Sequence, residues 1–506
     1  MKPKNGPLSF VVLTSNWIEC RIVFDIIFRG GDIIDGTGAP RVRADLVVQG
    51  DTIAFIGDAR SLCASRNIDA TGLVLAPGFI DCHAHDDRAV LETPHMAPKI
   101  SQGVTTVING NCGISLAPYK NTPGDPPMPL RTVEPRFRFD SFAHYLDALD
   151  ANPPALNVAT LVGHTSLRVR HQADLNRAAT PAETEAMRAA ASRALEDGAI
   201  GLSSGTFYPP AFAAPAEEIV GVGRDLKRWG GVYTSHMRTE GDGVAEAIEE
   251  TAGIAKALDV PLVISHHKVT GKANFGRTRE TLAQIALLQQ TQPICLDCYP
   301  YTASSSLLRR ERLTLCDEIL ITYSKTEPDA AGSNVTDLAK QWGCTREDAL
   351  DRVMPGMGMF FFMDEDDVRR VLSFPATMIG SDGIPSDDYP HPRLWGTFTR
   401  LLGHYSRDTG LVPLEQMVHK MTGLTACNFG LQGRGELKVG YCADITVFDP
   451  VKVRDRATYL DPEVASEGIS HVLVNGTPVW GPEGATGARP GRCLRRTGNP
   501  VTPPSH

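Results

Sequence analysis

The 506-residue chain lacks a hydrophobic run long enough to cross a bilayer, and it lacks an excess of positive charge. Its 59 aspartates and glutamates outnumber its 50 lysines and arginines, which gives a net charge of −9. This mildly acidic balance argues against a surface for nucleic acids or for anionic membranes. The 11 cysteines are odd in number and scattered, so we expect a cytoplasmic location rather than a disulfide framework.

The start of the chain also lacks the marks of a signal peptide. Its segment "MKPKNGPLSFVVLTSNWIEC" has two lysines and a short apolar patch, but no clear small-residue cleavage site. We therefore interpret residues 1–22 as an N-terminal extension. The polar, proline-rich end of the chain predicts a loose tail over residues 493–506.

Both ends of the remaining chain have the pattern of short β-strands. Apolar and polar residues alternate between glycine and aspartate turns in "FDIIFRGGDIIDGTG" and "ADLVVQGDTIAFIGD", and again in "GELKVGYCADITVFDP". The sequence thus predicts one small β-sandwich domain made of residues 23–78 and 431–492. A larger unit is inserted into it.

The inserted residues 79–430 alternate between buried-strand patterns and helical patterns. One helix is predicted after Thr180, where a capping box with Glu183 begins it and Gly198 ends it. Eight apolar segments end in polar residues: "GFIDCHAH", "TTVINGNC", "NVATLVGH", "AIGLSSG", "GVYTSHMR", "PLVISHHK", "PICLDCYPY" and "TMIGSDG". This rhythm predicts an α/β fold with a (β/α)₈ TIM barrel. An open doubly wound sheet is the alternative, but no glycine-rich phosphate turn follows the first strand. Residues 306–376 are predicted to be a helical insertion that could act as a lid.

Potential metal ligands follow several of these strands, where barrel enzymes place their active sites. His83 and His85 are two residues apart, so both can point to the same side of a strand. Cys112, His236 and Asp382 follow other strands, as do the adjacent His266 and His267. A single histidine at a strand end is usually structural, but this combination of imidazole, thiolate and carboxylate is typical of zinc. The pair Cys295 and Cys298 has no partner at zinc spacing, so we interpret it as part of a strand.

Several motifs resemble a known family. "APGFIDCHAHDD", "NGNCGISLAP", "GLSSGTFYPP", "SHMR", "ISHHK", "DCYPY" and "GSDG" are similar to motifs of the amidohydrolase superfamily, and within it of the N-acyl-D-amino-acid deacylases. The resemblance implies one metal position of His83, His85 and Asp382, and another of Cys112, His236 and His266. It further implies one tightly bound zinc ion and a second, weaker site. Many relatives use a carboxylated lysine on the fourth strand, but "AIGLSSGTFYPP" contains no lysine.

The same resemblance implies hydrolysis of the amide bond of N-acyl-D-amino acids. Zinc would activate a water molecule, and Asp382 would act as general base and then as general acid. Tyr208 or His164 would help to stabilise the oxyanion. The expected substrate-binding residues are the two cations suited to a carboxylate and three hydroxyl donors from the family pocket: Lys268, Arg393, Tyr208, Tyr299 and Ser305.

Two other functions compete with this one. A cyclic-amide hydrolase of the hydantoinase or dihydropyrimidinase type should carry the bridging lysine that the fourth strand lacks. A non-catalytic barrel that serves as a binding protein should have lost metal ligands. The expected partner is a small-molecule N-acyl amino acid, with no nucleic acid and no membrane. The preferred amino-acid side chain and the oligomeric state stay open, and the preference for D over L substrates rests on the resemblance alone.

Overall fold

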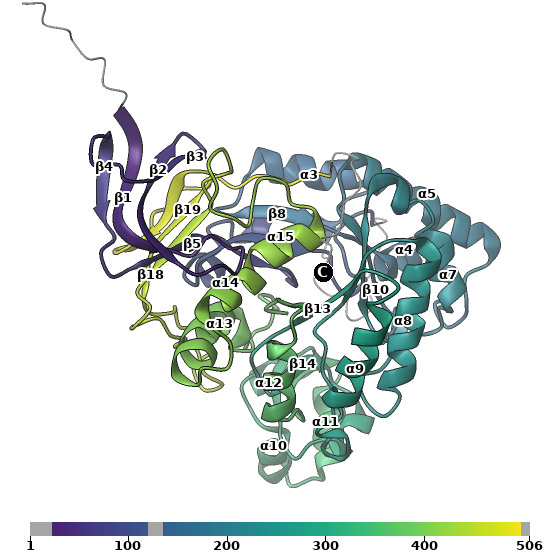
Figure 1. The fold of residues 1–506 in the computed structure, drawn as a ribbon. Coiled ribbons are helices and arrows are strands. Elements are labelled where there is room, and N and C mark those ends of the chain that lie inside the picture. The colour runs from purple at the N-terminus through teal and green to yellow at the C-terminus, as the bar shows by residue number, and fades with distance from the viewer. Residues whose placement is uncertain (1–22, 120–134, 497–506) are drawn as a thin grey trace, which may run out of the picture.

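The computed structural model describes residues 23–119 and 135–496, so the expectations for residues 1–22 and 497–506 lie outside the described residues. A β-sheet unit and a barrel unit lie side by side (Figure 1). None of the helices in the described part of the chain is both long and apolar enough to span a membrane. The helices are α1 (Ala89–Glu92), α2 (Ala97–Ile100), α3 (Phe142–Ala151), α4 (His164–His171), α5 (Pro181–Asp197), α6 (Pro209–Phe212), α7 (Ala216–Val222), α8 (Val244–Leu258), α9 (Thr278–Leu288), α10 (Val335–Trp342), α11 (Arg346–Val353), α12 (Glu365–Ser373), α13 (Arg393–Arg400), α14 (Leu414–Met421) and α15 (Gly423–Phe429).

A nine-stranded sheet joins the two ends of the chain. Strand β5 is the junction, because it pairs in parallel with β1 and antiparallel with β18. Alternating side chains such as Ile26, Phe28, Leu46 and Ile445 form one hydrophobic cluster from both ends of the chain. The strands are β1 (Val23–Ile33), β2 (Val42–Gln49), β3 (Thr52–Gly57), β4 (Cys63–Asp69), β5 (Val74–Pro77), β18 (Ile445–Phe448), β19 (Ile469–Val474), β20 (Thr477–Gly481) and β21 (Gly484–Ala485).

The predicted barrel is confirmed, and its strands match the predicted segments, with β7 beginning one residue earlier, at Val104. The strands are β6 (Phe79–Asp81), β7 (Val104–Asn109), β8 (Asn157–Thr160) with β9 (Val162–Gly163), β10 (Gly201–Gly205), β11 (Val232–His236), β12 (Leu262–Ile264), β13 (Ile294–Cys298) and β17 (Thr377–Ile379). Only Leu161 separates β8 from β9, so these two act as one barrel strand. The barrel closes between β17 and β6, where the Cys82 amide donates to the Ile379 carbonyl at 3.1 Å and the Asp382 amide donates to the His83 carbonyl at 2.8 Å.

The strands of the barrel share a hydrophobic core, and helices cover its outer side. Ile80, Ile108, Leu161, Val232 and Val263 come from different strands and pack together inside the barrel. The predicted helix after Thr180 is α5, with both halves of the capping box formed and Gly198 at its C-terminal cap. Helices α5, α7, α8 and α9 lie along the outer side of the barrel strands (Figure 1).

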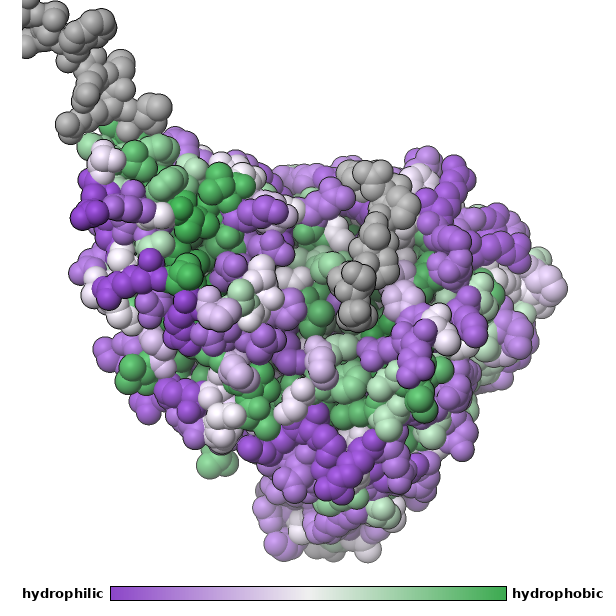
Figure 2. Space-filling model, in the orientation of Figure 1, coloured by the Kyte–Doolittle hydropathy of each residue, from purple (hydrophilic) through white to green (hydrophobic). Residues whose placement is uncertain are grey.

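The insertion between β13 and β17 differs from the expected helical segment. It contains α10, α11 and α12, but also an antiparallel sheet of β14 (Ala303–Leu307), β16 (Gly356–Phe361) and β15 (Ile319–Ser324). The helical expectation was wrong for these strands because β14 pairs with a strand about fifty residues later, and local periodicity does not reveal such pairing. Figure 2 shows a largely hydrophilic surface over α10 and α11. A lid role for this insertion stays a prediction.

The end of the described chain is also packed rather than loose. Cys493 forms a parallel bridge with Val158 of β8, and the Leu494 amide donates to the Val158 carbonyl at 2.8 Å. Arg496 donates to the carbonyl of Phe429 at 2.6 Å. The expected tail is therefore wrong for residues 493–496, because the backbone groups of this segment find partners at the barrel.

Candidate metal centre and active site

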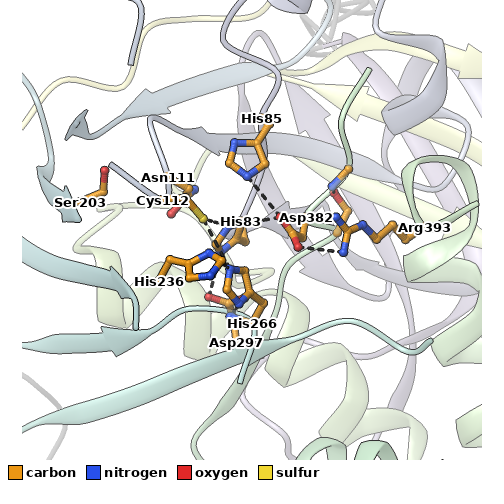
Figure 3. A network of polar contacts seen from close by, with 12 residues as sticks. His83, His85, Asn111, Cys112, Ser203, His236, His266, Asp297, Asp382 and Arg393 are labelled. Carbon is orange, nitrogen blue, oxygen red and sulfur yellow. Dashed lines mark hydrogen bonds and ion pairs between the residues drawn. The ribbon is translucent and has the colours of Figure 1, made fainter. Parts of the chain in front are cut away.

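The six predicted ligands converge at the carboxyl ends of the barrel strands (Figure 3). Their donor atoms form three overlapping groups, and within each group all donor atoms lie within 4.8 Å of one another. The groups are His83 with His85 and Cys112, Cys112 with His236 and His266, and His83 with His266 and Asp382. The shared members make one continuous centre.

The Cys112 thiol lies between the two halves of this centre. Its Sγ is 3.3 Å from His83 Nε2 and 3.5 Å from His266 Nε2. His236 Nδ1 lies 2.9 Å from His266 Nε2, and Asp382 Oδ1 lies 3.2 Å from His85 Nε2. Buried nitrogen, sulfur and carboxylate donors that lie this close to one another form a ligand set that suits zinc.

The backbone turns sharply at three of these ligands. Cys112, His266 and Asp382 have φ angles of 55°, 34° and 48°, in the left-handed region that side-chain-bearing residues rarely adopt. Such strain is concentrated at functional sites. The turn at His266 brings its ring into the centre, while His267 Nε2 lies 2.9 Å from Thr281 Oγ1 on α9. The structure thus places His266, rather than His267, among the candidate ligands.

Two carboxylates that the sequence analysis missed contact the Nδ1 atoms of two of the candidate histidine ligands. Asp297 Oδ2 lies 3.3 Å from His83 Nδ1, and Glu240 Oε1 lies 3.0 Å from His266 Nδ1. Asp297 also accepts a hydrogen bond from the His266 amide at 2.8 Å. Carboxylates in this position orient a histidine and fix its tautomer for metal binding. The acidic residue inside the buried strand "CLDC" was a usable signal for Asp297, whereas Glu240 lies in no motif.

The charges around the centre favour its ionised ligands. Burial raises the pKa of the Cys112 thiol, but the neighbouring His83 and His266 hold this pKa well below its usual value. Burial also raises the pKa of Asp382, and Arg393 with His266 holds it well below its usual value. A thiolate and a carboxylate are the forms that bind a metal.

The predicted substrate residues differ in the contacts that they make. Arg393 Nη1 is 2.8 Å from Asp382 Oδ2, yet none of its three guanidinium nitrogens makes a hydrogen bond within the described residues. The Tyr299 ring lies 4.5 Å from the Arg393 guanidinium carbon and 5.7 Å from Lys268 Nζ. The Tyr208 ring lies 4.8 Å from the His236 ring. Ser305 is buried on β14, and its Oγ has no hydrogen-bond partner in the described chain.

Two of the expected residues are occupied by protein partners. Lys268 Nζ lies 2.5 Å from Glu240 Oε1, 2.9 Å from His266 Nδ1 and 3.0 Å from the His266 carbonyl oxygen. A substrate role for Lys268 therefore stays a prediction, because the structure shows it in contact with Glu240 and His266. His164 Nε2 lies 3.1 Å from Glu218 on α7, so its observed contact is away from the ligands.

The chain is similar to known proteins over most of its length. The model of the amidohydrolase family matches residues 66–293 and 345–480. The chain is 52% identical to a D-aminoacylase of Alcaligenes xylosoxydans xylosoxydans, over 94% of this chain and 98% of that protein. It is 48% identical to an N-acyl-D-aspartate deacylase of the same organism, over 93% and 95% of the two chains, and 44% identical to its N-acyl-D-glutamate deacylase, over 93% and 96%.

Solved structures give the same result. A D-aminoacylase crystal structure at 52% identity superimposes with a TM-score of 0.91, over 94% of this chain and 100% of that one. An N-acyl-D-glutamate deacylase of Bordetella bronchiseptica, at 45% identity and the same coverage, has a TM-score of 0.91 and was solved with zinc and a phosphonate mimic of the tetrahedral intermediate. An L-hydantoinase from Arthrobacter aurescens, at 17% identity and a TM-score of 0.59 over 94% and 100% of the chains, shares the fold alone. The chain therefore belongs to the amidohydrolase family.

Proposed function

We propose that this chain is a zinc-dependent N-acyl-D-amino-acid deacylase, which releases a carboxylate and a free D-amino acid. The observation that carries this proposal is the continuous six-ligand centre with a cysteine between its halves. Relatives at 44–52% identity are named D-aminoacylase, N-acyl-D-aspartate deacylase and N-acyl-D-glutamate deacylase, which supports it. The fourth barrel strand, β10, reads "GLSSG" and offers no lysine for the bridging group expected of a hydantoinase.

The residues present fit a zinc site in two parts. His83, His85 and Asp382 would hold one position, and Cys112, His236 and His266 would hold the other. A bound zinc ion supplies Lewis acidity, which lowers the pKa of a water molecule and polarises a carbonyl group. One ion is tightly held and a second is weaker in this proposal. A D-aminoacylase at 51% identity is described as having a binuclear centre with one-metal activation and second-metal attenuation.

Asp382 is placed to move the proton in the reaction. Its Oδ1 faces His85 within the centre, and its Oδ2 is held by Arg393. The carboxylate takes a proton from the water that attacks the amide carbon. When the carbon–nitrogen bond breaks, the carboxylic acid returns that proton to the leaving nitrogen. Arg393 keeps the carboxylate in place through both steps.

Tyr208 is the donor best placed to assist at the oxyanion. Its ring lies against His236 at the edge of the centre. Burial raises the pKa of Tyr208 well above its usual value, and the nearby Cys112 and Asp382 charges raise it further. The hydroxyl therefore stays protonated and can donate a hydrogen bond to negative charge that develops on the carbonyl oxygen.

Arg393 and Tyr299 supply the proposed anchor for the substrate α-carboxylate. Arg393 is fully buried and its Nη1 lies 2.8 Å from Asp382 Oδ2, but its Nε and Nη2 have no hydrogen-bond partner among the described residues, which is costly unless a ligand completes them. Its planar group can bind a carboxylate through two parallel hydrogen bonds. Within the described residues, the Tyr299 hydroxyl makes only a distant contact with Met363 Sδ, at 4.0 Å, which an anion can replace.

A substrate panel tests the proposed reaction. Zinc-loaded protein should hydrolyse N-acetyl-D-Met or N-acetyl-D-Glu, but neither N-acetyl-L-Met nor hydantoin, and prolonged chelation should remove zinc and activity together. The measurement is product by liquid chromatography, with zinc content determined in parallel. Hydantoin opening without deacylation would favour the cyclic-amide hydrolase, and zinc-replete protein inert toward every substrate would favour the binding protein.

The Tyr299→Phe variant tests the carboxylate anchor. Loss of one hydrogen bond to a charged group, worth about 1.5–3 kcal/mol, should raise KM roughly tenfold or more while kcat changes little. Steady-state kinetics with N-acetyl-D-Met measures both parameters. As a control, the methyl amide of the same substrate lacks the anion, and wild type and variant should treat it alike. An equal KM for the two enzymes with N-acetyl-D-Met would remove Tyr299 from the anchor.

A further inference from the structure

Lys99 is a fully buried ammonium at the junction of the first and last barrel strands. It lies on α2, and its side chain has no exposed surface. Its Nζ donates hydrogen bonds to Asp81 Oδ2 at 2.6 Å and to Ser381 Oγ at 2.8 Å, and it lies 3.2 Å from Asp86 Oδ2. Asp81 ends β6 and Ser381 follows β17, so one side chain links the two strands between which the barrel closes. We call these four residues the Lys99 cluster.

The charges of the Lys99 cluster hold its members together. Burial lowers the pKa of the Lys99 ammonium, but the Asp81 and Asp86 carboxylates raise it above its ordinary value, so Lys99 stays positively charged. Both carboxylates are buried as well. A buried ion is costly unless groups of opposite charge complete it, and the loss of one partner leaves the others uncompensated. The three charged side chains are therefore confined to one arrangement.

The partners of this ammonium also fix the backbone at two metal ligands. Asp81 Oδ1 accepts a hydrogen bond from the Ser381 amide at 2.8 Å and one from the His83 amide at 3.3 Å. Ser381 Oγ accepts another from the Gly383 amide at 3.1 Å. Ser381 and Gly383 flank Asp382, whose φ of 48° is in the left-handed region. These bonds hold a backbone conformation that side-chain-bearing residues rarely adopt.

The Lys99 cluster reaches only one of the two proposed metal positions. Asp86 directly follows His85, as Ser381 directly precedes Asp382. His83 Nε2 and His85 Nε2 lie 3.6 Å and 3.2 Å from Asp382 Oδ1 (Figure 3). In the part of the chain that the structure describes, no hydrogen bond or ion pair joins the cluster to a ligand of the other position. The ligands of that other position are Cys112, His236 and His266.

We propose that Lys99 is a positioning residue, which holds His83, His85 and Asp382 in the geometry of one metal position through the residues next to them. The proposal rests on the two-part zinc site proposed above, but not on the reaction at that site. Ligand atoms must lie within about 0.2 Å of their ideal distance from a metal ion, so a small shift of the backbone weakens binding. Groups that keep ligands in place typically contribute about 10–100-fold to metal affinity.

The test compares zinc binding by Lys99→Met and by the parent protein, since methionine keeps most of the length of lysine but removes the charge. Zinc-loaded full-length protein is equilibrated against buffers of decreasing free zinc, and the zinc per chain is measured at each concentration. His85→Ala identifies the step of this curve that belongs to the position of His85, and His236→Ala identifies the other step. Lys99→Met should shift the His85 step to roughly 10–100-fold higher free zinc and leave the His236 step within about threefold of the parent value.

Lys420→Met is the matched control, because it removes another buried ammonium beside the same strand. Lys420 Nζ donates to the carbonyl oxygens of Phe374 at 2.5 Å and Thr377 at 3.4 Å. Thr377 begins β17, whereas Asp382 follows the other end of this strand. The control should therefore lose stability and leave both zinc steps unchanged. Thermal unfolding compares the stability that the two variants lose.

Other outcomes would overturn the assignment. Unchanged zinc steps in Lys99→Met, or an equal shift in Lys420→Met, would mean that Lys99 only stabilises the barrel. If Lys99→Met does not fold, Ser381→Ala removes the hydroxyl link and keeps every charge of the cluster; it should shift the His85 step about tenfold, and no shift would contradict the proposal. If His85→Ala shifts no step, the two-part zinc site and the role of Lys99 fail together. Normal zinc steps without deacylation would refute the proposed reaction alone.

Discussion

An Asp382→Asn variant should fold and retain its tightly held zinc, but its kcat should fall by about 10²–10⁴-fold, the usual contribution of general acid–base catalysis. Asparagine is nearly isosteric with aspartate and can still face His85, which lies 3.2 Å from Asp382 Oδ1 in the structure. It cannot accept the proton of the attacking water. Steady-state kinetics on the best substrate of the panel, with zinc content measured alongside, gives the result.

Asp297→Asn is the matched control for this experiment. The two carboxylates lie on the two sides of His83, because Asp297 faces its Nδ1 and Asp382 its Nε2. The control should weaken zinc affinity by roughly 10–100-fold, and added zinc should restore most of the rate, since Asp297 only orients the histidine. If added zinc also restores Asp382→Asn, then Asp382 is a ligand of a dispensable metal. A zinc-replete variant with the parent rate would exclude Asp382 as the proton carrier.

Replacing Cys112 by alanine should remove the tight zinc ion together with nearly all deacylase activity. The reason is geometric, because Cys112 belongs to two of the three ligand groups and its Sγ lies between His83 and His266. Without the thiolate, these imidazoles lose the negative charge that faces them, and a zinc position loses one of the donors that it needs. Metal analysis after gel filtration and the rate with and without added zinc measure both effects.

Cys295→Ala separates the loss of a ligand from the loss of a buried cysteine. Cys295 is buried in β13, and its Sγ contacts Asn428 Oδ1 at 2.9 Å rather than a metal ligand. This control should cost some stability, on the order of 1 kcal/mol, and leave zinc content and rate close to the parent values. Normal zinc binding and turnover in Cys112→Ala would show instead that its thiol is structural.

The sequence by itself determined the barrel strands and the residues that follow them. Each strand can be recognised from its own residues, as an apolar run that ends in polar residues. The (β/α)₈ topology places the carboxyl ends of all these strands at the same end of the barrel. His83, His85, Cys112, His236 and Asp382 could therefore be assigned to one site before any contact was known. The capping box of α5 was predicted for the same reason, since all its parts lie within one turn of the chain.

Only the tertiary structure decided the features that depend on distant partners or on backbone angles. The φ of 34° at His266 sends its ring inward, which the alternation of an ideal strand does not predict. The β14–β16 pairing, Glu240 behind His266, and Asp297 behind His83 each join segments separated by many residues. A local sequence pattern indicates which side chains a segment buries. The packing of distant segments determines which residues become their neighbours, and the chemistry of this site depends on those neighbours.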